Sequence, residues 1–108
     1  MATKVSNAKF EVEKFNGKIN FELWKLKVRD LLVQQGLHKA LAGKAKKPMG
    51  MTDEEWEDFD LRAMSSIWLC LANEVLSNVT AEVSVASLWS RLESLYMTKS
   101  LMNRLYLK

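Results

Sequence analysis

The sequence predicts an all-α fold, a small bundle of four to five helices with an extended N-terminal segment. Two observations predict it. Beyond residue 20, apolar residues recur at spacings of three and four, which is the period of one helical face. Thr52 and Glu55 also form the pattern of a capping box, which marks the start of a helix. Alternating runs are too few to predict a sheet of three or more strands.

The chain has 108 residues, which is the size of one domain. Residues 1–9 are expected to form a flexible tail, and residues 10–108 the helical domain. Phe10, Val12 and Phe15 then follow in near alternation, before the turn signal Asn16-Gly17. This pattern predicts an extended segment that lies against the helices.

The first helix is predicted near residues 20–36, with Asn20 as its N-cap and Gly36 as a left-handed residue that ends it. One helical face carries Phe21, Trp24, Val28, Leu31 and Leu32. A second apolar set lies nearly opposite and consists of Leu23, Leu26, Val33 and Leu37. A helix that is apolar on two sides usually packs between two neighbours, but it can also present one side to a partner molecule.

The segment after this helix, residues 38–50, has the composition of a loop and is rich in lysine. Its functional interpretation is contact with phosphate groups, and the alternative is a solvated loop. The candidate phosphate contacts are Lys39, Lys44, Lys46 and Lys47.

The second helix is predicted over about residues 53–78. Met51 and Trp56 fit the hydrophobic staple that accompanies a capping box. The run at 67–72 is apolar all round the helix, so it is expected to be buried on every side.

A third helix is predicted near residues 85–97, capped by Ser84, and a fourth near 99–108, beginning at Thr98 or Ser100. The side chains expected to be mostly buried in the core are Trp24, Trp56, Trp89, Ile67 and Leu92.

The net charge of +3 is unevenly distributed along the chain. Residues 1–50 have a balance of +7, and residues 51–96 have a balance of −7. This asymmetry can steer one copy toward another, or toward nucleic acid. The alternative is that the opposite charges lie together on one folded surface.

The sequence offers little chemistry for catalysis, and we expect no catalytic, cofactor-binding or metal-binding residues. His38 is the single histidine, and Cys70 lies inside an apolar run, where an inert core thiol is the favoured interpretation. The acidic residues at 53–60 lack the spacing of a calcium-binding loop. Without an N-terminal signal segment or a long apolar run, the expected localisation is cytoplasmic, with no membrane partner and no small-molecule substrate.

Four stretches resemble a known family. FNG at 15–17, the pair Phe21 and Trp24, LLVQQGLHKAL at 31–41 and RLESLYMTKSLMNRLYLK at 91–108 closely resemble the Gag region of plant copia-type LTR retrotransposons. The resemblance covers about residues 9–108. It implies an all-helical, capsid-forming module that assembles with copies of itself and packages RNA. In that family the sequence continues into more helix and a zinc knuckle that binds RNA, so this chain is expected to be truncated at its C-terminus.

The resemblance favours a structural function by self-association. The alternatives are a small helical protein that binds nucleic acid weakly and without sequence preference, or a Gag remnant without function. If the chain stops within a helix, an apolar set near its end is expected to lack cover. That helix then either folds back onto Leu88 and Leu92 or pairs with the same helix of a second copy. The candidate self-association residues are Leu101, Met102, Leu105 and Tyr106.

Overall fold

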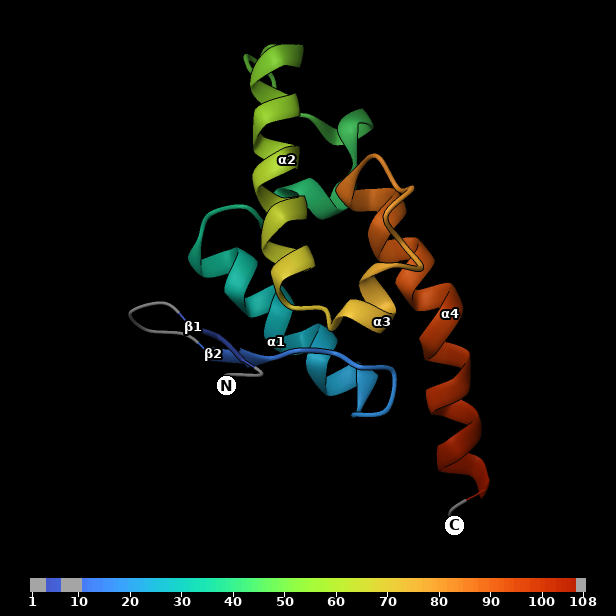
Figure 1. The fold of residues 1–108 in the computed structure, drawn as a ribbon. Helices are drawn as coiled ribbons and strands as arrows, with labels where there is room; N and C mark the ends of the chain where they lie inside the picture. Colours follow the sequence, from blue (N-terminus) through green and yellow to red (C-terminus); the bar gives the residue numbers. More distant parts are fainter. Residues whose placement is uncertain (1–3, 7–10, 107–108) are drawn as a thin grey trace.

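The computed structural model describes the backbone of residues 4–6 and 11–106 and the side chains of residues 12–97. Three longer helices form the body: α1 (Phe21–Gln34), α2 (Asp53–Leu69) and α4 (Val85–Tyr106). The shorter elements are α3 (Asn73–Leu76), the 3-10 helices η1 (His38–Ala42) and η2 (Lys44–Lys46), and the strands β1 (Lys4–Ser6) and β2 (Glu11–Glu13). Helix α1 packs against both α2 and α4 (Figure 1). The prediction of a small all-α bundle is confirmed.

The N-terminal segment is extended, as predicted. Strand β2 pairs with β1 in an antiparallel ribbon, with Val5 opposite Val12. Strand β1 lies within the predicted tail, whereas the rest of that tail and Phe10 lie outside the described residues. The segment continues to Phe15, which forms an isolated parallel bridge with Leu71. In the described part of the chain no sheet has more than these two strands.

Helix α1 begins and ends as its sequence predicts. The Asn20 side chain accepts a hydrogen bond from the backbone N–H of Leu23 at 3.0 Å. At the other end Gly36 adopts a φ of +74°, which a side chain would strain. The Leu37 N–H then donates to the Leu32 carbonyl at 2.7 Å, and the Leu37 side chain is buried. This arrangement is a Schellman motif.

The start of α2 is also as predicted, but its end is not. Thr52 and Glu55 make both hydrogen bonds of the capping box, at 3.0 and 2.8 Å. The helix ends at Leu69, so the prediction of one helix over residues 53–78 is wrong. The Cys70 carbonyl accepts hydrogen bonds from the Phe15 N–H at 2.9 Å and from Trp24 Nε1 at 3.1 Å. These two donors lie outside the helix, and they replace the helical N–H that would otherwise bond to this carbonyl. The chain therefore turns before α3.

Helix α4 receives two caps at its N-terminus. Ser84 accepts a hydrogen bond from the Ser87 N–H at 3.2 Å, as expected of an N-cap. The Asp60 carboxylate of α2 accepts from the Val85 N–H at 3.3 and 3.4 Å. Burial raises the pKa of Asp60, and the hydrogen bond from Val85 opposes that shift.

The C-terminal part of α4 corrects another prediction. The chain forms one continuous helix from Val85 to Tyr106, so the expected break near residue 98 is absent. Neither Gly nor Pro interrupts this stretch, and a Thr or Ser in a helix interior costs little. Because the helix is continuous and Leu88 and Leu92 are already buried, the alternative in which the end of the chain folds back onto them does not occur. The last turns of α4 extend beyond the rest of the body (Figure 1).

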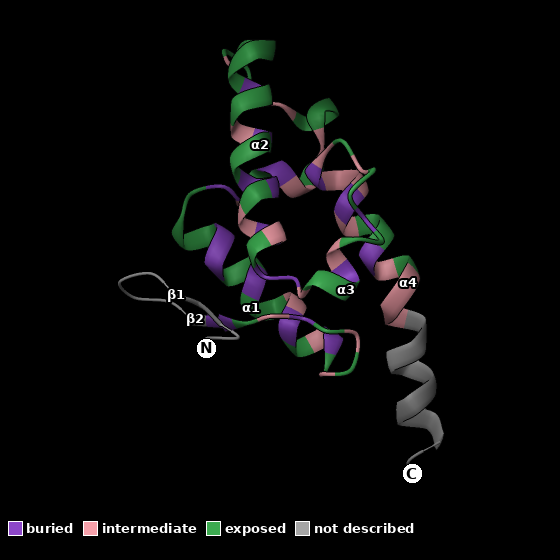
Figure 2. Cartoon of the chain, viewed as in Figure 1, coloured by how far each residue is buried: buried purple, intermediate pink, exposed green. Residues whose placement is uncertain are grey.

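The core is formed by α1, α2 and α4 together, and all three helices carry buried residues (Figure 2). Of the five side chains predicted to be mostly buried, Trp24, Trp56, Ile67 and Leu92 are buried, whereas Trp89 is partly buried. The centre holds an aromatic cluster of Phe15, Phe21, Trp24, Trp89 and Tyr96, with ring centroids 4.8 to 6.2 Å apart between neighbours.

Candidate functional site

The predicted phosphate-contacting lysines lie on or beside the two 3-10 helices. Lys39 belongs to η1, and Lys44 and Lys46 belong to η2. Lys47 forms an ion pair and hydrogen bond with Asp53 at the start of α2, and Lys44 lies 3.8 Å from the same carboxylate. The hydrogen bond from Lys47 is the main cause that lowers the pKa of Asp53, and the positive charge of Lys44 is the next. The fold therefore uses two of the four lysines internally.

The remaining two lysines, Lys39 and Lys46, are exposed and form no ion pair with another described residue. Of the four lysines predicted to contact phosphate, these two are available to do so. Residues 38–50 are expected from the sequence to form a loop, but they contain the 3-10 helices η1 and η2. η1 also packs against α1, α2 and α4, and Ala40 is buried.

The uneven charge of the sequence is partly neutralised within the fold. Lys25 of α1 reaches Glu93 of α4, with 2.7 Å between Nζ and Oε2. Together with the pairing of Lys44 and Lys47 with Asp53, this contact joins the basic N-terminal half to the acidic half. For these residues, the interpretation that opposite charges lie together on one folded surface holds.

The four predicted self-association residues lie in the last turns of α4. Leu101, Met102, Leu105 and Tyr106 are placed by the helix backbone, but their side chains lie outside the described residues. Their proposed contact stays a prediction.

The structure reveals an apolar surface on α1. Of the second apolar set of this helix, Leu37 is buried, whereas Leu23, Leu26 and Val33 are 49, 54 and 41% exposed. The sequence left open whether this side packs inside the protein or faces a partner. All three side chains therefore remain partly exposed.

A shallow groove of about 440 Å³ lies between α1 and α4 and shares Leu26 with this surface. Its apolar lining combines exposed Leu26 with partly buried Trp89 and Met97. Its charged lining consists of Glu22, Lys25 and Arg29. Sequence reasoning missed this groove because its two walls come from distant parts of the chain, and only the packing of α1 against α4 brings them together.

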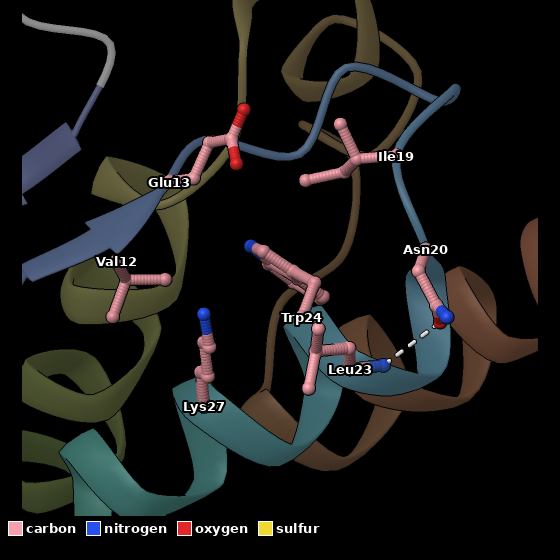
Figure 3. Close-up of a pocket in the computed structure, with 7 residues that line it drawn as sticks. All are labelled: Val12, Glu13, Ile19, Asn20, Leu23, Trp24 and Lys27. Atoms are coloured by element: carbon pink, nitrogen blue, oxygen red, sulfur yellow. Dashed lines mark hydrogen bonds between the residues drawn. The ribbon is translucent and has the colours of Figure 1, made fainter.

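A smaller pocket of about 210 Å³ opens between the N-terminal segment and α1 (Figure 3). Its apolar lining consists of Val12, Ile19, Leu23 and Trp24, and Glu13 and Lys27 line it from the two opposing elements. Asn20 completes the lining, but its side chain is already engaged as the cap of α1. The pocket thus shares Leu23 with the apolar surface of α1.

The residues that could carry chemistry are held in unreactive environments. Cys70 is buried, and burial raises the pKa of its thiol to about 12, so the thiolate is scarce at neutral pH. The Nδ1 atom of His38 is buried and accepts or donates no hydrogen bond in the described structure. Among the described residues no three His, Cys, Asp or Glu side chains gather as metal ligands would. No helix in the same part of the chain combines the length and apolar character of a membrane span.

Comparison with known proteins identifies a family and a relative of this chain. The family model described as the gag polypeptide of LTR copia-type matches residues 28–108. The chain is 51% identical over 104 residues to the retrovirus-related Pol polyprotein from transposon TNT 1-94 of Nicotiana tabacum. That similarity covers 96% of this chain but 8% of the polyprotein, so the chain corresponds to a small part of this relative. No solved structure shows significant similarity.

Proposed function

The chain belongs to the gag polypeptides of copia-type LTR retrotransposons, and we propose that it is a structural module that associates with copies of itself, without catalysis. The relative carries the name of a Pol polyprotein, but the similar segment is a small part of it and matches a gag model. The unreactive surroundings of Cys70 support the non-catalytic part of the proposal.

One observation carries the proposal. The exposed side chains Leu23, Leu26 and Val33 lie on one side of a helix whose other side is packed into the core. Apolar side chains gathered on one face mark an interaction surface. Single exposed leucines are common on soluble proteins, but here three apolar side chains belong to the same helix and two of them line pockets.

The proposal is tested by sedimentation equilibrium of the purified chain over a concentration series. The expected result is a weight-average mass that rises with concentration above that of the 12.4 kDa monomer. A mass that stays monomeric across the whole series contradicts the proposed function.

A second contact is predicted at the end of α4. Leu101 and Leu105 are four residues apart on this helix, so they share one face, and a two-fold contact needs only one self-complementary patch. We expect the variant with Leu101→Asp and Leu105→Asp to lose this contact and to show a lower weight-average mass at high concentration. Its helical circular-dichroism signal should be largely retained. An unchanged mass distribution would exclude a contact through residues 99–108.

Weak RNA binding is a second candidate function, favoured by the exposure of Lys39 and Lys46. We expect binding that is independent of sequence and lost at moderate salt, since a few lysine–phosphate contacts are readily screened. Filter binding with single-stranded RNA at two salt concentrations measures this. The double variant Lys39→Glu and Lys46→Glu should abolish binding. Tight, sequence-selective binding at physiological salt would contradict the expectation.

A further inference from the structure

We infer that copies of this chain associate head to tail, with the outer face of α2 of one copy seated in the groove between α1 and α4 of the next. The inference rests on the proposed self-association and adds the two surfaces that meet and the polarity of the contact. The surface on α2, here called the α2 ridge, consists of Glu54, Glu57 and Leu61. The groove is the one lined by Leu26, Arg29, Trp89 and Met97.

The groove has an apolar floor and an available positive charge. Leu26 is 54% exposed, and Trp89 and Met97 are partly buried beside it. Lys25 is already held by Glu93, and Glu22 has an interaction of its own within the chain. Arg29 is exposed and forms no ion pair with another described residue. A partner for this groove should therefore present an apolar side chain next to a carboxylate.

The α2 ridge presents that combination. Glu54, Glu57 and Leu61 are spaced by three and four residues, so they lie on one face of the helix. All three are exposed, and Leu61 is 57% exposed. Neither glutamate forms an ion pair with another described residue, in contrast to Asp58, which Arg62 pairs at 3.1 Å. The ridge thus offers an apolar side chain beside two exposed glutamates, and the groove offers apolar side chains beside Arg29.

Charge complementarity is what selects a second copy as the occupant of the groove. The fold pairs Lys25 with Glu93, and both Lys44 and Lys47 with Asp53. Arg29 and Glu57 have no such partner among the described residues, and each lies on a helix that also exposes a leucine. Proteins often recognise each other in this way: side chains spaced by three and four residues on one helix bind in an apolar groove of the partner.

The two surfaces lie on different helices, so the contact is heterologous. Each copy then offers one groove and one ridge, and a pair of copies leaves one of each unused. Such a contact propagates into a ring or an open chain of copies rather than stopping at a dimer. An isologous contact, in contrast, is complete in the pair.

This polarity provides the test. Arg29→Glu disables the groove and leaves the ridge intact, whereas Glu57→Lys disables the ridge and leaves the groove intact. Both are made in the Leu101→Asp, Leu105→Asp background, which removes the contact predicted at the end of α4. Each variant alone should lose self-association, seen as at least a roughly tenfold rise in the dissociation constant. Mixed together, the two should associate again, because the intact groove of one variant meets the intact ridge of the other and the two reversed positions also carry opposite charges.

Combining Arg29→Glu and Glu57→Lys in one chain gives a second, independent readout. Because both charges are reversed together, the groove of one copy and the ridge of the next again carry opposite signs, so association should return. The matched controls are Lys18→Glu and Glu74→Lys, which make charge reversals of the same kind at exposed positions outside the two surfaces. Both controls should associate as the background chain does. Because all of these positions are exposed, thermal unfolding should be nearly unchanged in every variant.

The outcomes separate this inference from the proposed function. If the unsubstituted chain stays monomeric, the proposed function itself fails, and the inference fails with it. If the unsubstituted chain associates but the background chain does not, or if Arg29→Glu and Glu57→Lys associate as the background chain does, self-association stands and uses other surfaces. A mixture of the two variants that stays monomeric would also overturn the head-to-tail contact.

Discussion

Replacing Phe15 by alanine is expected to lower the free energy of unfolding by about 3–5 kcal/mol. This is a large part of the total stability of a small domain, which is about 5–15 kcal/mol. The Phe15 ring is buried at the centre of the aromatic cluster, with its centroid 5.2 Å from that of Phe21, 5.3 Å from that of Trp24 and 4.8 Å from that of Tyr96. Its removal leaves a cavity that touches the N-terminal segment, α1 and α4 together.

The measurement is urea unfolding followed by circular dichroism, with Phe59→Ala as the matched control. Phe59 is only partly buried, and its ring contacts Trp56 at a centroid distance of 5.4 Å. The same chemical change there should cost clearly less. If both variants lose equal stability, the aromatic cluster around Phe15 does not have the central role described above.

This cluster also explains why the stretches that resemble the family are informative. Phe15 comes from FNG, Phe21 and Trp24 from the start of α1, and Tyr96 from the LESLY stretch of α4. Asn16 closes the turn by accepting hydrogen bonds from the backbone N–H groups of the second and third residues after it, at 2.8 and 3.2 Å. The most recognisable residues of the sequence therefore specify how the N-terminal segment is held against two helices, which is a structural role.

Features set by neighbouring residues could be predicted from the sequence. The caps at Asn20, Thr52 and Ser84 depend on hydrogen bonds over three residues, and each is found as predicted. The left-handed Gly36 likewise depends on the local requirement for a positive φ. These signals fix where helices begin and, in one case, where a helix ends.

Features set by distant residues could not be predicted. The groove between α1 and α4 requires Leu26 to lie near Trp89, and no short-range pattern records that proximity. The second cap of α4 has the same cause, since Asp60 reaches Val85 from another helix. No local pattern in the acidic residues at 53–60 indicates that Asp60 makes this contact.

The end of α2 is the clearest case in which tertiary structure overrides a helical pattern. The apolar run at 67–72 is compatible with a helix that is buried on every side, and the sequence predicts that the helix continues to about residue 78. Instead the Ala72 N–H donates to the Phe15 carbonyl at 2.9 Å, and the chain lies beside the N-terminal segment as a short parallel bridge. As a result Leu71 is buried, whereas Leu69 is 59% exposed.

This difference gives a prediction with a built-in control. Leu71→Ala is expected to lower the free energy of unfolding by about 2–5 kcal/mol, because it empties a packed site. Leu69→Ala should change it by no more than about 0.5 kcal/mol, because an exposed side chain is removed from a helix end. The two positions carry the same residue type and are separated by one residue, so differences in composition or unfolded-state behaviour largely cancel. Chemical denaturation of both variants under identical conditions measures the difference. A continuous helix buried on every side would instead make both changes costly, so equal and large losses would mean that α2 does not end at Leu69.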